Sequence, residues 1–281
     1  MKKIHLLIID PQNDFCRYDR PDKPPTGEET GLDYFNGSLF VNGADQDMDR
    51  LAAMINRIHK KITGLHVTLD SHRLIDVAHP IFWINDKNES PPPFTIIEKE
   101  DVIDGVWRPR NIAWQKRMVD YVTALEDNKR NKLCIWPPHC MIGTEGHAIY
   151  KSVSEAILIW SGGFRIPNFC TKGSNIFTEH YSAVKADVPD PADASTQINT
   201  PFLDLLKVAD EILLSGEALS HCLASTAGDI FDDFGEDAIK KFVLLTDACS
   251  NVGGFEPLGE GFINEYTAKG MRTSTTVEYL A

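Results

Sequence analysis

The chain lacks an excess of basic residues, and this absence excludes several kinds of partner. It has 41 Asp and Glu against 28 Lys and Arg, which gives a formal net charge of -13 at pH 7. Binding to nucleic acid or to an anionic membrane surface is driven by clustered Lys and Arg, and no basic stripe occurs along the sequence. We therefore expect neither nucleic acid nor a membrane surface as a partner.

Long apolar runs are also missing. Near the N-terminus the segment KKIHLLIID is basic and then apolar, but Asp10 ends the apolar run after six residues. A signal-peptide core needs at least about 7 apolar residues and a membrane-spanning helix about 20. None of the six cysteines forms a CxxC pair, which indicates free thiols in a reducing compartment. We expect a cytoplasmic protein with a first strand at this point.

The order of the apolar segments predicts one α/β domain. Residues 3–9 form a near-continuous apolar run, which is typical of a strand buried on both faces. Strand and helix patterns then alternate to residue 281 with no internal repeat and no low-complexity linker. We therefore predict a single domain over residues 1–281, built around a mainly parallel sheet.

The expected elements follow from apolar spacing. Helices are expected at residues 44–61, 111–125, 152–160, 201–208 with Thr200 as its N-cap, and 260–269. Further strands are expected at residues 64–69, 165–171, 211–215, 241–246 and 273–279. Two stretches rich in Pro, Gly and charge, about residues 17–43 and 84–110, are expected to be loop insertions.

The segment from Leu213 to Phe234 is typical of a strand, a tight connection and a cysteine that opens a helix. Unpaired N–H groups and the helix dipole in a first helical turn favour negative charge, so this position predicts a lowered pKa for the Cys222 thiol. The plain alternative is that Cys222 packs as a small buried hydrophobe.

Three polar residues lie at the C-terminal ends of expected strands. They are Asp10, Lys172 and Cys222, and this end of a parallel sheet is where distant residues meet in one crevice. Together they predict a nucleophilic thiol, a carboxylate that exchanges its proton, and an ammonium that positions both.

Histidines near a second strand end indicate a metal site. Asp70 and His72 are two residues apart on an extended segment and point to the same side, and His79 and His139 are candidates for further ligands. Oxygen and nitrogen donors suit Zn, Fe or Mn. The alternative is that these histidines make ordinary hydrogen bonds on loops.

Five motifs, in chain order, carry a resemblance to known enzymes. They are DPQNDF from Asp10, DxH from Asp70, WPPHCxxGTxG from Trp136, Lys172 with the following Gly, and GxxxxHC ending at Cys222. The set covers nearly the whole chain and resembles the nicotinamidase branch of the isochorismatase-like cysteine hydrolases.

The resemblance implies a three-layer α/β/α sandwich and a role in NAD salvage. The implied reaction is hydrolysis of nicotinamide to nicotinate and ammonia through a thioester, with one divalent metal ion, Zn being expected and Fe or Mn being the alternatives. Asp10, Lys172 and Cys222 would be the catalytic triad.

The resemblance also assigns the remaining site residues. Asp70, His72 and His139 would bind the metal ion that holds the pyridine nitrogen. Phe15 and Trp136 would flank the ring. The backbone N–H groups of Ala218 and Cys222 would form the oxyanion hole, with a cis peptide between Glu217 and Ala218.

Two departures leave alternatives open. His79 follows His72 after six residues, whereas relatives have five, so His79 stays a further candidate ligand only. Ser71 stands where relatives usually carry an aromatic residue. Three roles for the insertions stay open: they cover the crevice, they form a homo-oligomer contact, or they change which small amide enters. The chain is then a nicotinamidase, a cysteine amidase for a different small amide, or a non-catalytic binding or thiol-sensing module.

Overall fold

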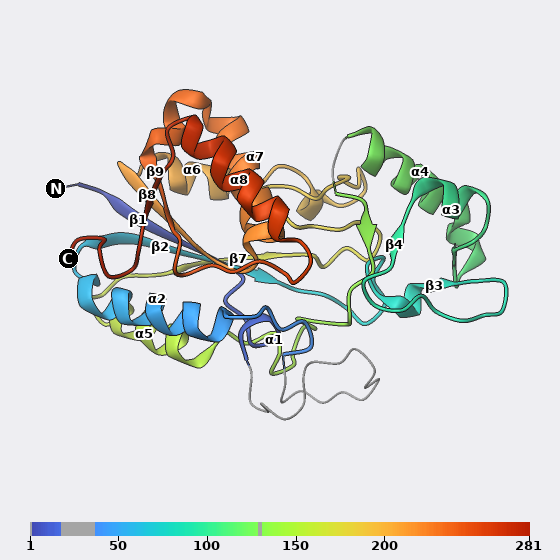
Figure 1. Ribbon diagram of the computed structural model, residues 1–281, viewed down its shortest axis with the longest axis horizontal. Helices are drawn as coiled ribbons and strands as arrows, with labels where there is room; N and C mark the ends of the chain where they lie inside the picture. The colour runs from blue at the N-terminus through green and yellow to red at the C-terminus, as the bar shows by residue number, and fades with distance from the viewer. Residues whose placement is uncertain (1, 18–36, 129–130) are drawn as a thin grey trace.

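A six-stranded parallel sheet forms the centre of the molecule. The computed structural model describes residues 2–17, 37–128 and 131–281. The strand order is β10-β9-β8-β1-β2-β7, and every neighbouring pair is parallel (Figure 1). The strands are β1 (Ile4–Ile9), β2 (Ile62–Asp70), β7 (Asn168–Lys172), β8 (Glu211–Gly216), β9 (Phe242–Leu245) and β10 (Arg272–Ser274).

Helices cover both faces of this sheet, so the predicted three-layer α/β/α sandwich is confirmed. One layer contains α2 (Ala44–Ile58) and α5 (Lys151–Ser161), which pack side by side (Figure 1). The opposite layer contains α6 (Thr200–Lys207), α7 (Ala224–Phe234) and α8 (Glu256–Ala268). The hydrophobic core lies between the sheet and these two layers.

The central strand β1 explains why the site forms at one edge of the sheet. All six of its residues are buried, as its continuous apolar run predicts. It pairs with β2 on one side and with β8 on the other. Because these strands are parallel, Asp10 after β1, Asp70 at the end of β2 and Lys172 at the end of β7 lie at the same edge.

A smaller lobe lies beside the sandwich (Figure 1). It contains two antiparallel pairs, β3 (Trp83–Ile84) with β5 (Arg108–Pro109) and β4 (Ile96–Ile97) with β6 (Leu133–Cys134). Its helices are α3 (Lys99–Ile103) and α4 (Gln115–Asp127). The first of these helices was not predicted, although a capping box between Glu98 and Asp101 stabilises its start.

Several element boundaries differ from the sequence prediction. The N-cap of α6 is Asn199, whose side chain accepts a hydrogen bond from Phe202 N, so the assignment of Thr200 as the cap is wrong. Strand β10 ends at Ser274, because Thr276 turns to donate two hydrogen bonds to the Asp247 carboxylate. Of the insertion expected at residues 17–43, residues 18–36 lie outside the described residues.

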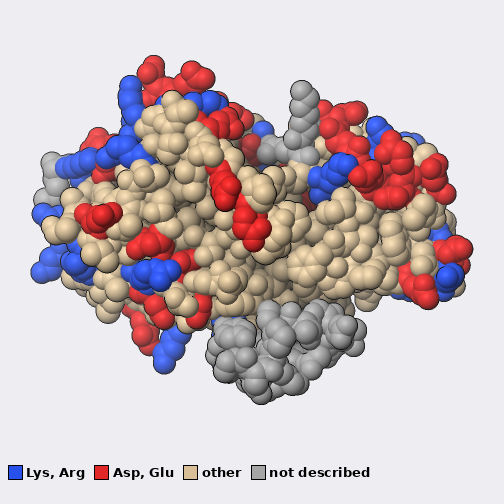
Figure 2. Space-filling model, in the orientation of Figure 1, with Lys and Arg blue, Asp and Glu red and all other residues tan. Residues whose placement is uncertain are grey.

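The surface agrees with the acidic composition. Figure 2 shows Asp and Glu side chains at both ends of the visible face, with Lys and Arg scattered among them. Within residues 2–17, 37–128 and 131–281, no helix is long and apolar enough to cross a membrane.

Candidate active site

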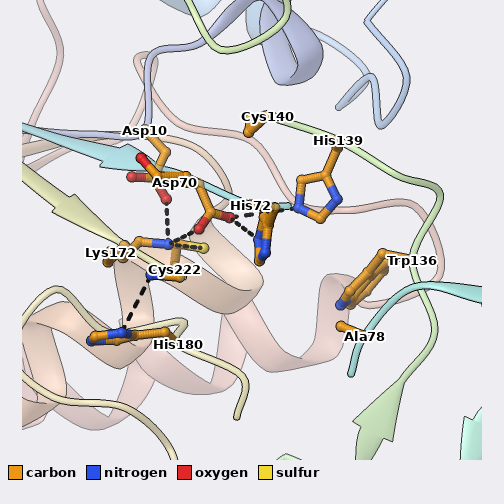
Figure 3. A network of polar contacts seen from close by, with 12 residues as sticks. Asp10, Asp70, His72, Ala78, Trp136, His139, Cys140, Lys172, His180 and Cys222 are labelled. Carbon is orange, nitrogen blue, oxygen red and sulfur yellow. Dashed lines mark hydrogen bonds and ion pairs between the residues drawn. The ribbon is translucent and has the colours of Figure 1, made fainter. Parts of the chain in front are cut away.

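Asp10, Lys172 and Cys222 meet in one buried site, as their places at strand ends predict. Lys172 Nζ lies 2.9 Å from Asp10 Oδ2 and 3.5 Å from Cys222 Sγ (Figure 3). All three are buried, at 0%, 3% and 6% relative exposure for Asp10, Lys172 and Cys222. A thiol, an ammonium and a carboxylate in contact away from water are suited to nucleophilic chemistry.

The neighbouring strand fixes the Asp10 carboxylate. Thr68 on β2 donates from Oγ1 to Asp10 Oδ1 over 2.5 Å, and it accepts a 3.0 Å hydrogen bond from Asp10 N. The second carboxylate oxygen of Asp10 is therefore left facing Lys172. Sequence reasoning missed Thr68, because its role depends on strand pairing.

Burial dominates the titration of these groups. It raises the pKa of Asp10, and the nearby Lys172 ammonium opposes that shift only in part. Burial also raises the pKa of the Cys222 thiol well above its usual value, with Lys172 again acting in the opposite direction. The prediction of a lowered thiol pKa is thus wrong: a helix start was visible in the sequence, but the depth of burial and the carboxylates of Asp10 and Asp70 were not.

Cys222 lies in η4 (Leu219–Leu223), a π-helical turn between β8 and α7. Leu223 N donates to Ala218 O, and the peptide bond between Glu217 and Ala218 is cis, as the resemblance implied. The cysteine therefore precedes α7 instead of opening it.

Asp70 connects this group to a cluster of histidines. One of its oxygens, Oδ1, lies 3.1 Å from Lys172 Nζ, and the other, Oδ2, lies 3.1 Å from His72 Nε2 and 3.5 Å from His139 Nε2 (Figure 3). Asp70, His72 and His139 each offer a ligand atom, and these atoms lie within 4.8 Å of one another. The three predicted ligands are therefore brought together.

The ring orientations fit a bound cation. The Nδ1 atoms of His79 and His139 face carbonyl oxygens, Leu74 O at 3.1 Å and Pro137 O at 2.9 Å. A carbonyl only accepts, so Nδ1 carries a proton in both rings, and Nε2 is the ring nitrogen left to face a cation. His72 Nδ1 likewise lies 3.0 Å from the Asp76 carboxylate, which is the usual support for a metal-bound histidine.

His79 lies beside the three ligand candidates but outside their set. Its ring centroid is 5.3 Å from that of His72 and 5.6 Å from that of His139. Its Nε2 is buried and has no hydrogen-bond partner among the described residues. Burial lowers the pKa of His79 to about 3, so the ring is neutral and able to donate its lone pair.

Two aromatic side chains contact histidines at or beside the site. Phe15 contacts His139 edge-on at 5.4 Å, and Trp136 contacts His221 edge-on at 5.2 Å. Trp136 Nε1 donates to Tyr181 Oη over 2.9 Å, which fixes the indole ring. Phe15 and Trp136 were predicted as substrate contacts, whereas Tyr181 was not.

Two residues inside the first motif also order the site. The Gln12 amide donates to Asp70 O over 2.8 Å and accepts from Asp70 N over 2.7 Å. The Asp14 carboxylate accepts from Cys140 N over 2.6 Å, next to His139. Both side chains are buried, and their signal in the sequence was a polar run directly after an apolar strand.

Comparisons with known proteins place the fold. No known family's sequence model matches the chain, and no curated protein matches it by sequence. Solved structures do match. The Acinetobacter baumanii nicotinamidase/pyrazinamidase has a TM-score of 0.59 at 19% identity, covering 99% of each chain. The fold is that of the nicotinamidases.

Two further solved structures with this fold contain a bound ligand. The yeast nicotinamidase bound to the inhibitor nicotinaldehyde has a TM-score of 0.59 at 16% identity, covering 97% of this chain and 99% of its own. The Pyrococcus horikoshii pyrazinamidase in complex with zinc has a TM-score of 0.52 at 16% identity, covering 97% of this chain and 99% of its own. These similarities show the fold, and the chemistry must be inferred from the site residues.

Proposed function

We propose that the protein is a metal-dependent cysteine amidohydrolase that converts nicotinamide to nicotinate and ammonia. The observation that carries the proposal is the single buried site in which Cys222, Lys172 and Asp10 lie against the donor set of Asp70, His72 and His139. The nicotinamidase fold supports the same reaction class.

Acylation begins with the Cys222 thiol, whose raised pKa keeps it protonated at rest. Asp10 accepts this proton as the sulfur attacks the carboxamide carbon, and its own raised pKa suits it to the transfer. Asp10 then gives the proton to the departing nitrogen, ammonia leaves, and the acyl group remains on sulfur as a thioester. A water deprotonated by Asp10 hydrolyses the thioester to nicotinate and restores the thiol.

Lys172 and the turn before α7 stabilise the charges that develop. The pKa of Lys172 is lowered by burial but raised further by Asp10, Asp70 and Cys222, so the ammonium stays charged. It positions the Asp10 carboxylate and the sulfur at the distances given above. The N–H groups of Ala218 and Cys222 receive the oxyanion, which is the role of backbone donors in acyl transfer.

Asp70, His72 and His139 would hold the metal ion, with His79 as a further candidate ligand. Their imidazole and carboxylate donors fit Zn, Fe or Mn, and zinc is the first choice because the Pyrococcus horikoshii pyrazinamidase binds it. The ion would supply a Lewis-acid contact for the ring nitrogen of the substrate. Phe15 and Trp136 would flank that ring.

Ammonia release tests this function. Nicotinamide, pyrazinamide and benzamide are incubated with the purified protein, and the metal content of the same sample is measured. We expect turnover of the two ring-nitrogen amides and much slower turnover of benzamide, because benzamide has no ring nitrogen. Cys249→Ala serves as the control, since Cys249 is a buried cysteine in the segment after β9 and outside the triad.

Two other results of this assay would support the alternative functions. Turnover of another small amide with none of nicotinamide would favour a different cysteine amidase. Binding of these amides without any turnover would favour the non-catalytic module.

A further inference from the structure

A buried pair of acidic side chains lies behind the turn that carries Cys222. Glu217 is fully buried, and Asp47 on α2 is 3% exposed. Ser250 donates to both carboxyl groups, from N to Glu217 and from Oγ to Asp47, so the two acids share one buried site. Two carboxylates in one such site repel each other, and a proton on one of them turns that repulsion into a hydrogen bond.

The contacts of each side chain indicate which of them is the acid. Asp47 accepts from Ser250 Oγ over 2.5 Å and pairs with Arg50, so it is surrounded by donors. Glu217 accepts one hydrogen bond, from Ser250 N over 3.1 Å, and its Oε1 accepts none from the described residues. An ionised Glu217 would leave that buried oxygen without a donor, whereas a protonated Glu217 donates to Asp47.

The pair is connected directly to the catalytic turn. Glu217 N donates to Ile9 O over 2.8 Å, one residue before Asp10, and Leu219 N donates to Ser250 O over 2.8 Å. Ser250 therefore contacts both acids and the turn. Glu217 directly precedes Ala218, whose N–H is part of the proposed oxyanion hole.

We propose that Glu217 is a positioning residue: held as a neutral acid that donates to Asp47, it fastens the turn of residues 217–222 to α2 and so places Ala218 and Cys222. The role of the turn rests on the proposed function, whereas the acid pair does not. The Asp47 carboxylate, with Ser250 and Arg50 around it, is the fixed acceptor of this contact.

The surroundings favour the neutral acid. Among the described residues, the charged and titratable groups that interact with the pair include Arg50 of α2, Cys249 after β9 and Cys16 of α1 (Asn13–Cys16). Asp45 lies near Cys16, and Asp247 lies near Cys249. Burial raises the pKa of Glu217 well above its usual value, and the Asp47 charge raises it further. Burial likewise raises the pKa values of Cys16 and Cys249, so both thiols are neutral.

The protonation state has a measurable signature in stability. A carboxyl whose pKa is raised by folding contributes stability that is complete below its unfolded pKa and is lost as the pH rises through its folded pKa. The substitution Glu217→Gln keeps a neutral donor and an acceptor in the same shape but cannot ionise. The unfolding constant of the wild type should therefore rise relative to that of Glu217→Gln, by up to about tenfold per pH unit for one proton.

The first experiment is urea unfolding of the wild type, Glu217→Gln and the exposed control Glu236→Gln from pH 5 to pH 9. We expect the wild type to lose stability relative to Glu217→Gln as the pH rises. The free energies of unfolding of the wild type and Glu236→Gln should change with pH in the same way. The same pH dependence of unfolding in the wild type and Glu217→Gln would overturn the proposal that Glu217 is a neutral acid in the folded protein.

The second experiment is hydrogen exchange of the turn. Glu217→Val removes both polar contacts, so amide exchange in residues 216–223 should become about tenfold faster or more, while Glu217→Gln restores protection and a peptide from α5 stays unchanged. Wild-type exchange in Glu217→Val would overturn the positioning role. If Glu217→Val does not fold, the unfolding series still decides the acid pair. Neither readout uses an amide substrate, so inactivity on nicotinamide would refute the proposed function and leave this inference standing.

Discussion

Asp76 provides a sharp test of the metal site, because its carboxylate supports His72 without being a predicted ligand itself. Its Oδ2 accepts from His72 Nδ1 over 3.0 Å, and its Oδ1 accepts from Ala78 N over 3.0 Å. Asp76→Asn keeps the shape and the contact to Ala78. It places an NH₂ group opposite His72 Nδ1, so that nitrogen must now accept, and the proton moves to Nε2.

The magnitude follows from that change of tautomer. A protonated Nε2 has no lone pair for a cation, and loss of such a supporting carboxylate costs about 10–100-fold in metal affinity, or about 1.4–2.7 kcal/mol. We expect zinc to bind Asp76→Asn correspondingly more weakly in competition with a chelating dye. Asp86→Asn, at an exposed position in the small lobe, should bind like the wild type. Wild-type affinity in Asp76→Asn would refute the assignment of His72 as an Nε2 ligand.

Three further predictions concern buried polar groups. Lys172→Met removes the only ammonium next to the buried Asp10 carboxylate among the described residues and one of the partners of Asp70, so the metal-free protein should lose about 3–5 kcal/mol in urea unfolding. A loss below about 1 kcal/mol would contradict the ion-pair geometry. Gln12→Leu removes the two hydrogen bonds to the Asp70 backbone. Each buried backbone group left unpaired destabilises the protein by about 1–3 kcal/mol, so we expect a lower melting temperature together with weaker zinc binding. Burial lowers the pKa of His66 to about 4, so its contribution to the free energy of unfolding is complete above pH 6.5 and is lost as the pH falls toward 4, by up to about 3 kcal/mol. His66→Gln should therefore lose less stability than the wild type between pH 6.5 and pH 4. An identical loss in both proteins would contradict this prediction.

The site was predictable from the sequence where a local pattern and a topological rule sufficed. A buried apolar run ending in Asp10 indicated a central strand, and the rule that parallel strands end at one edge brought Asp10, Asp70 and Lys172 together. The histidine of the WPPH motif was predictable in the same way, because prolines keep that segment extended.

Properties that depend on depth and on distant neighbours were not predictable. The helix after Cys222 suggested a lowered thiol pKa, but burial beside two carboxylates reverses the direction. Glu217 has the appearance of an ordinary charged residue in the sequence, and its partner Asp47 lies on a helix far earlier in the chain. Such pairs arise from packing, which no local pattern records.

The most direct test of the central claim is trapping of the acyl group on Cys222. The protein is mixed with nicotinamide, quenched in acid within the first turnovers, and digested for mass spectrometry of the peptide that contains Cys222. We predict a nicotinoyl thioester on this cysteine, together with ammonia release that disappears in Cys222→Ala and persists in Cys249→Ala. Ammonia release at the wild-type rate from Cys222→Ala would contradict the account.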